Sequence, residues 1–284
     1  MSLKRLFAAL SAPLLAILAV LAVQPAAGYA QASEPPAEQP AGPAHFVVSW
    51  EKLKPANEKI ARKLRHSRAV ERVVSAVNAL VQVPQELGIV FTDDVEIGPA
   101  YLPDQNGQEL HVIVVPGHFL RTEQDIFRKA LKGVKGLSVN QAVRYATQFV
   151  IAHEIGHALV DQLDLPVTGK EEDAVDGFAA YLLTSERQFG PMGPVSAGLL
   201  FDGLSTPAND LDDSDFADEH SMPQQRVYQL LCWVYGSDTK RYRGLVGKGG
   251  LPKRRAVRCA DEYKQLRSSW DRLLAPHHAA PVAA

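Results

Sequence analysis

Apolar residues recur at intervals of three and four over residues 57–81, and this spacing predicts an amphipathic helix. The polar face of that helix is basic, and we expect water to cover it. Its basic residues are Lys59, Arg62, Lys63, Arg65, Arg68 and Arg72. Four shorter apolar runs, at residues 46–50, 87–91, 96–102 and 109–115, predict strands.

The last two of these runs flank a turn that contains Asn106 and Gly107, which is a strong hairpin signal. They should therefore pair as antiparallel strands of a small sheet. The run at 109–115 is expected at an edge of this sheet, where an extended peptide can bind by strand addition. A short helix is expected at 122–131.

A long helix is predicted from Ser138 to about Leu163. Ser138 and Gln141 form a capping-box pattern at its start, and Pro166 follows its end. A second helix should begin near Lys170, and the short connection makes the two helices antiparallel neighbours. The predicted fold is α+β, with a small sheet, the long helix and a helical C-terminal region.

The N-terminal segment has the pattern of a secretory signal peptide. Lys4 and Arg5 precede an almost wholly apolar run at 6–23, and a small-residue cleavage pattern ends at Ala32. Residues 1–32 are therefore predicted to be a signal peptide, and the protein to be exported to the periplasm or secreted. An uncleaved membrane anchor is the alternative, since about 18 apolar residues are just long enough to span a bilayer.

The rest of the chain divides into three parts. Residues 33–44 are rich in Pro and Ala and predict a flexible linker. Residues 45–276 should form one folded domain, and residues 277–284 a disordered tail that includes His277 and His278. After signal cleavage no stretch is apolar enough to span a membrane.

Composition narrows the classes of partner. Of 284 residues, 46% are hydrophobic and 22% charged, which is typical of a globular protein. The chain has 30 Lys and Arg against 32 Asp and Glu, so it lacks the basic surplus of a nucleic-acid-binding protein. The two cysteines, Cys232 and Cys259, are predicted to form a disulfide in an oxidising compartment. The sequence carries no signature of a particular oligomeric state.

The long helix contains the motif His153-Glu154-Ile155-Gly156-His157. Two His at i and i+4 lie on one helix face, so both imidazoles can bind one metal ion. Glu154 projects beside them, where it can take a proton from a metal-bound water. Together these spacings indicate a catalytic metal site.

A catalytic zinc ion needs a third protein ligand and an open position. Glu172 at the start of the second helix is our candidate ligand, with Glu171 and Asp173 as competitors. Asp176 lies one turn beyond Glu172 on the same face, where it can accept the second ring N–H of His153.

The motif followed by the segment EDAVDGFA resembles the glutamate zincins, metallopeptidases whose third ligand is a Glu on a second helix. This resemblance implies one Zn²⁺ ion held by His153, His157 and Glu172. It also implies that Glu154 is the general base and that Asp176 supports the site.

Most of the mature chain is similar to the bacterial DUF4344 family of metallopeptidases. The similarity is carried by residues 218–238 and 251–263 in addition to the two helices. The resemblance implies a peptide or protein substrate. The chain departs from the family near the predicted hairpin, where residues 98–101 and 115–118 lack the cysteines that we would expect.

One catalytic role remains open at this point. A zincin of this type often places a His or Tyr opposite the base to stabilise the oxyanion, and His220, Tyr228 and Tyr181 are candidates. His220 can equally belong to a helix N-cap region. The sequence thus predicts an exported zinc-dependent peptidase. The alternative is a non-catalytic exported binding protein with the same fold and a structural zinc ion.

Overall fold

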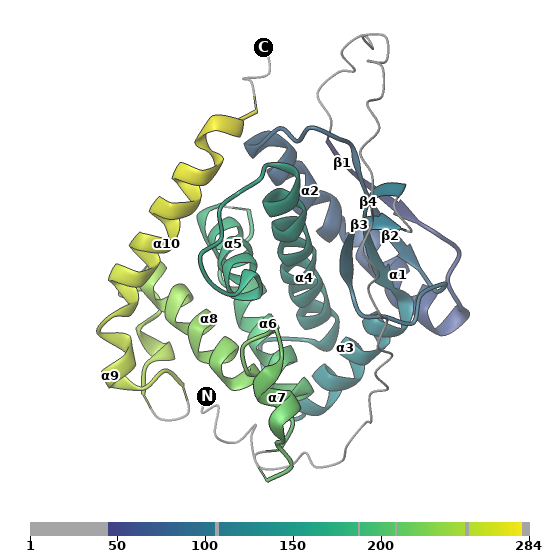
Figure 1. Cartoon of the computed structure of the whole chain (residues 1–284). Coiled ribbons are helices and arrows are strands. Elements are labelled where there is room, and N and C mark those ends of the chain that lie inside the picture. Colours follow the sequence, from purple (N-terminus) through teal and green to yellow (C-terminus); the bar gives the residue numbers. More distant parts are fainter. Residues whose placement is uncertain (1–44, 106–107, 187, 208, 248–249, 280–284) are drawn as a thin grey trace.

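The computed structural model places a small sheet on one side of a central helix and a layer of helices on the other (Figure 1). It describes residues 45–105, 108–186, 188–207, 209–247 and 250–279. The predicted signal peptide at 1–32 and linker at 33–44 lie outside the described residues. The α+β class predicted from the sequence is confirmed.

The sheet has four strands in the order β1-β2-β4-β3. They are β1 (Phe46–Trp50), β2 (Leu87–Thr92), β3 (Ala100–Gln105) and β4 (Gln108–Pro116). β1 and β4 both pair with β2 in parallel, whereas β3 pairs with β4 in the predicted antiparallel sense. The turn residues 106–107 lie outside the described residues.

The expectation that the strand at 109–115 lies at an edge was wrong. β4 is an inner strand between β2 and β3, and the edges are β1 and β3. Periodicity predicts which residues face the core, but it does not reveal the parallel partner that β4 finds in β2.

The amphipathic helix predicted at 57–81 is in fact two helices, α1 (Pro55–Ser67) and α2 (Ala69–Leu80). Arg68 separates them in a left-handed conformation with φ 52°. Both helices bury their apolar faces in one core, so the spacing of apolar residues continues across the break. The pattern therefore could not reveal it.

The remaining elements follow in chain order. They are α3 (Gly117–Ala130), α4 (Val139–Gln162), α5 (Glu171–Ser185), α6 (Met192–Leu204), α7 (Asp213–Ala217), α8 (Pro223–Ser237), η2 (Arg243–Leu245), α9 (Lys253–Ala256), α10 (Cys259–Leu274) and η3 (Ala275–His277). The capping box of α4 is confirmed, because Ser138 Oγ accepts from Gln141 N at 3.3 Å and Gln141 Oε1 accepts from Ser138 N at 3.0 Å.

α4 is the structural centre, with β3 of the sheet on one side and α5 and α6 on the other (Figure 1). Its residues from Ala146 to Gly156 are buried, and these include His153 and Glu154 of the motif. Polar side chains on this helix must therefore find partners inside the protein. In the described part of the chain, no helix is both long enough and apolar enough to cross a membrane.

Two contacts hold the C-terminal helices in place, a disulfide and a main-chain pairing. Cys232 on α8 and Cys259 at the start of α10 form the predicted disulfide. Beyond α10, His277 O accepts from Gln82 N at 2.8 Å and Ala279 N donates to Leu80 O at 3.2 Å. Residues 277–279 therefore pair with the end of α2, and the folded part extends past residue 276, where the sequence predicted it to stop.

Candidate metal centre

Three side chains converge where α4 meets the first turn of α5. His153 Nε2 lies 3.1 Å from Glu172 Oε2, and His157 Nε2 lies 3.3 Å from Glu172 Oε1. One potential ligand atom from each residue lies within 4.8 Å of the others. The structure thus brings together the three residues that the sequence proposed as ligands.

Glycine allows the two helices to approach closely enough for this convergence. Gly156 lies between the two histidines on α4, and a Cβ atom built there would lie only 2.8 Å from Val175 Cβ on α5. Any larger residue would push α5 away. Because Val175 follows Glu172 by one turn, this contact also sets where the Glu172 carboxylate lies.

The two competitors for the third ligand have other partners. Glu171 accepts a hydrogen bond from His157 Nδ1 at 2.7 Å, so it lies behind that imidazole. Asp173 accepts from Ser221 Oγ at 2.8 Å. Of the three acidic residues in the first turn of α5, Glu172 is the one that faces both Nε2 atoms.

The donor set fits a cation. His153 Nδ1 lies 2.9 Å from Asp176 and His157 Nδ1 2.7 Å from Glu171, so the neutral form of each ring would carry its proton on Nδ1 and turn its Nε2 lone pair toward Glu172. Glu172 Oε2 is buried and has no hydrogen-bond partner of acceptable geometry among the described residues. Two lone pairs facing a carboxylate are stable only with a positive charge between them, so these three residues could hold a metal ion.

The ionisation of these groups shows the same preference for positive charge. Burial alone lowers the pKa of His153, but the neighbouring carboxylates of Asp176 and Glu172 outweigh that effect and raise the pKa to about 10. Burial likewise raises the pKa of Glu172, but the surrounding imidazoles hold it well below its usual range. A bound metal ion would take the place of the proton that these groups otherwise retain.

Asp176 is held from the other side by Arg226 on α8, a contact that the sequence analysis missed. Arg226 donates from Nε to Asp176 Oδ2 at 2.7 Å and from an η nitrogen to Asp176 Oδ1 at 2.8 Å. Its guanidinium also lies 3.7 Å from the ring centre of Phe201. Although burial raises the pKa of Asp176, Arg226 and His153 lower it overall, so the carboxylate stays ionised next to His153.

Glu154 lies beside the cluster and is 6% exposed. Its Oε2 accepts a hydrogen bond from the main-chain N–H of Tyr101 on β3 at 3.0 Å. Burial raises the pKa of Glu154, and the two neighbouring imidazoles only partly offset this. A carboxylate with a raised pKa next to an open cavity is suited to general base catalysis.

The cluster opens into a cavity of about 630 Å³ between β3, α4 and the start of α5. His153, Glu154, His157 and Glu172 line it, and so does His220 from the segment before α8.

The three candidates for the oxyanion stabiliser occupy different places. His220 Nε2 lies 2.9 Å from Glu172 Oε2, and its Nδ1 lies 3.0 Å from Asp218. Tyr181 donates its hydroxyl to Asp271 on α10, and Tyr228 is 41% exposed. The described residues that line the cavity include His220 and neither tyrosine.

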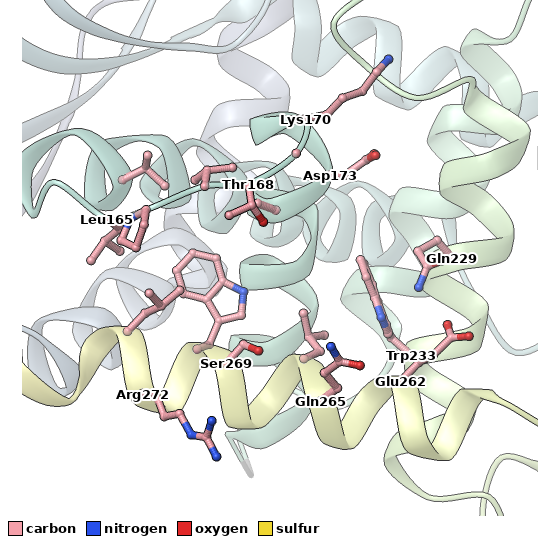
Figure 2. A pocket seen from close by; sticks show the side chains of 18 residues that line it. Leu165, Thr168, Lys170, Asp173, Gln229, Trp233, Glu262, Gln265, Ser269 and Arg272 are labelled. Carbon is pink, nitrogen blue, oxygen red and sulfur yellow. The ribbon is translucent and has the colours of Figure 1, made fainter.

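A second hollow, of about 710 Å³, is lined by the connection between α4 and α5 and by α8 and α10 (Figure 2). Trp233 on α8 and Ser269 on α10 face it, together with Thr168 of the connection. The described residues around it include none of the metal-facing histidines and not Glu154. Although this hollow is larger, the side chains that could hold a metal ion line the cavity at the cluster.

Comparisons with known proteins agree with this geometry. The model of the DUF4344 family, described as "Putative metallopeptidase", matches residues 51–274. No curated protein and no solved structure matches the chain.

Proposed function

The chain belongs to the DUF4344 family, and from this membership and the geometry of the cluster we propose that it is an exported zinc-dependent peptidase that hydrolyses peptide bonds. The observation that carries the proposal is the convergence of His153, His157 and Glu172 beside Glu154 at the bottom of an open cavity. A peptide or protein is the substrate class that this chemistry supports.

In this proposal His153, His157 and Glu172 hold one Zn²⁺ ion. When bound, zinc lowers the pKa of a coordinated water to about 7 and polarises the carbonyl of the scissile bond. Asp176 and Glu171 accept the Nδ1 protons of the two imidazoles and so fix the tautomer that presents Nε2 to the ion.

Glu154 is the general base. Its carboxylate is buried at the edge of the cavity, and the N–H of Tyr101 holds one of its oxygens. It takes the proton of the attacking water and later gives it to the leaving amine. Its raised pKa supports both transfers, because an acid that ionises nearer neutral pH can also return the proton.

His220 is proposed to stabilise the negative charge that develops on the substrate carbonyl. It lines the same cavity as Glu154 and is the candidate nearest the cluster. The Glu172 carboxylate raises the pKa of His220, so the imidazole more readily carries the proton that a developing oxyanion needs.

The proposal is tested by metal analysis and a peptide-library digest of the purified protein, with Glu154→Gln as the variant. We expect one zinc ion per chain in both proteins. We expect cleavage to fall about a hundredfold to ten-thousandfold in the variant, because the base is lost while the ligands stay. Glu186→Gln, an exposed change at the end of α5, is the matched control and should cleave like the wild type.

Cleavage that survives Glu154→Gln would refute the proposed mechanism. Bound zinc without cleavage of any peptide by the wild type would instead favour a non-catalytic binding protein with a structural zinc ion.

Export is the second part of the proposal. The pattern of residues 1–32 and the disulfide between Cys232 and Cys259 support it, because disulfides persist mainly outside the cytosol. N-terminal sequencing of the protein from a periplasmic or culture fraction should give Ser33 as the first residue, or Gln31 if cleavage follows the small-residue pattern Gly28-Tyr29-Ala30 instead. An intact N-terminus in the membrane fraction would show a tethered protein.

A further inference from the structure

Tyr101 connects the edge strand β3 to α4 through both its main chain and its side chain. Its N–H donates to Glu154 Oε2 at 3.0 Å, and its hydroxyl lies 2.6 Å from Asp161 Oδ2 and 2.8 Å from His111 Nδ1. We propose that Tyr101 is a positioning residue that holds β3 on α4 and thereby keeps Glu154 oriented for proton transfer. The catalytic part of this inference rests on the proposed peptidase function.

β3 is an edge strand, so the sheet holds it from one side only. Among the described strands it pairs with β4 alone, and the register shifts between Leu102 and Asp104. Pro103 lies at that shift and has no N–H to donate. The N–H of Tyr101 goes to Glu154, so it is not available to β4. Contacts with α4 therefore add to the pairing with β4 in fixing the position of this strand.

The hydroxyl of Tyr101 ties three elements together. A carboxylate only accepts hydrogen bonds, so Tyr101 donates its single hydroxyl proton to Asp161 on α4. The hydroxyl oxygen then accepts from His111 Nδ1 on β4, which assigns the Nδ1–H tautomer to that ring. His111 Nε2 is left buried and without a hydrogen-bond partner among the described residues, with Glu109 Oε2 3.8 Å away.

His111 also adopts a backbone conformation that a strand residue rarely takes, with φ 42°. Strained residues of this kind persist where the surrounding contacts fix them, and they often mark functional sites. An unpartnered ring nitrogen and a strained backbone both cost stability. The hydrogen bond to Tyr101 is the described contact that gives the His111 ring this orientation.

The two anchor points on α4 belong to the face that carries the metal ligands. Asp161 follows His157 by four residues and His153 by eight, so all three lie on one stripe of the helix. Glu154 and Asp161 are seven residues apart, which is about 10 Å along the helix axis. Tyr101, Glu154 and Asp161 also line the same cavity. Tyr101 therefore sets the position of the cavity wall relative to the base.

Tyr101→Phe removes the hydroxyl and keeps the ring and the N–H, which makes it the direct test. The matched control is Tyr181→Phe, which removes an equivalent bond from a tyrosine hydroxyl to Asp271 away from the cavity. Hydrogen exchange of residues 100–104 should become about tenfold faster in Tyr101→Phe and stay unchanged in Tyr181→Phe. Zinc affinity, measured by competition with a chelator, should stay within about threefold of the wild type in both.

For peptide cleavage we expect kcat to fall about tenfold in Tyr101→Phe while KM changes less than about threefold, because the base is misaligned and substrate contacts remain. Asp161→Ala should reproduce these effects, and the double variant should add little to either single change. If Tyr101→Phe does not fold, Asp161→Asn weakens the same bond from an exposed position.

The hydrogen-exchange and zinc-affinity measurements require no catalytic turnover. They therefore test whether Tyr101 holds β3 on α4 even if the wild type cleaves no peptide. Unchanged exchange at 100–104 in Tyr101→Phe would overturn the proposal. So would a fall in kcat no larger than that of Tyr181→Phe, or fully additive effects of Tyr101→Phe and Asp161→Ala.

Discussion

The two halves of α4 each face a buried carboxyl group from a neighbouring helix. One half carries the metal-facing histidines, and the other precedes it. At the first, Asp176 of α5 is 3% exposed, and both of its oxygens are bonded by Arg226 and His153. At the second, Glu123 of α3 is 0% exposed, and Thr147 is its one described hydrogen-bond partner. The Asp176 carboxyl group is thus buried within a hydrogen-bonded network, whereas the Glu123 carboxyl group is buried almost without partners.

The two carboxyl groups respond in opposite directions. Arg226 and His153 overcome the effect of burial and lower the pKa of Asp176, whereas burial raises the pKa of Glu123 well above its usual value. The one hydrogen bond that Glu123 receives offsets burial only in part. The Thr147 hydroxyl lies 2.9 Å both from Glu123 Oε2 and from Val143 O, and its single proton cannot serve both acceptors fully. Ionic partners, and not burial, decide which buried acid carries charge.

The largest expected effect comes from breaking the network. Asp176→Ala leaves the Arg226 guanidinium largely buried without its anion, and we expect it to destabilise the fold by about 3–5 kcal/mol. Urea unfolding at pH 7 would measure this. Asp173→Ala, an exposed change on the same helix, is the control and should cost less than about 0.5 kcal/mol. Equal costs for both variants would mean that the network is not a stabilising unit.

A smaller effect is expected at the metal. Arg226→Met removes the cation that orients Asp176, so the Asp176–His153 contact should loosen and zinc affinity should fall about 10–100-fold. Competition with a chelator gives this affinity directly. Arg254→Met, an exposed arginine on α9, should bind zinc like the wild type. Unchanged zinc affinity in Arg226→Met would show that Asp176 keeps its orientation without Arg226.

The smallest effect concerns the isolated acid. Because the folded-state pKa of Glu123 is raised, the folded protein binds a proton that the unfolded chain releases above about pH 4.3. Glu123 therefore stabilises the fold less as the pH rises. The glutamine in Glu123→Gln does not ionise, so it removes this pH-dependent loss of stability, and its side-chain amide can still form a hydrogen bond with Thr147. We expect the variant to gain about 1 kcal/mol over the wild type between pH 5 and pH 8.

Thermal unfolding at the two pH values would show this gain, and Glu186→Gln at the exposed end of α5 should show none. A variant whose stability relative to the wild type falls with rising pH would contradict the assignment of Glu123 as the neutral acid.

Local signals in the sequence predicted what is local in the structure. The capping box at Ser138, the spacing of His153 and His157 and the start of α5 depend on neighbours within one or two turns, so one sequence was enough. The bond between Arg226 and Asp176 joins residues 50 positions apart, and the inner place of β4 depends on its pairing with β2. Such long-range contacts leave no periodic trace.

The left-handed residue Arg68 was missed for another reason. Arg carries no conformational signal of the kind that Gly or Pro gives, and the apolar spacing continues on both sides of it. The same is true of His111, whose strained backbone lies in a run that reads as an ordinary strand. Only the partners of these residues in space explain their conformations.

The close contact of Gly156 with Val175 gives a rule for transplanting this motif. The pentapeptide at 153–157 is usually written with two unspecified positions, but Ile155 is fully buried here and Gly156 touches the helix that supplies the third ligand. A designer who grafts only the two histidines and the glutamate onto another helix pair would leave the interaxial distance undefined. In this fold, the absence of one Cβ atom sets that distance.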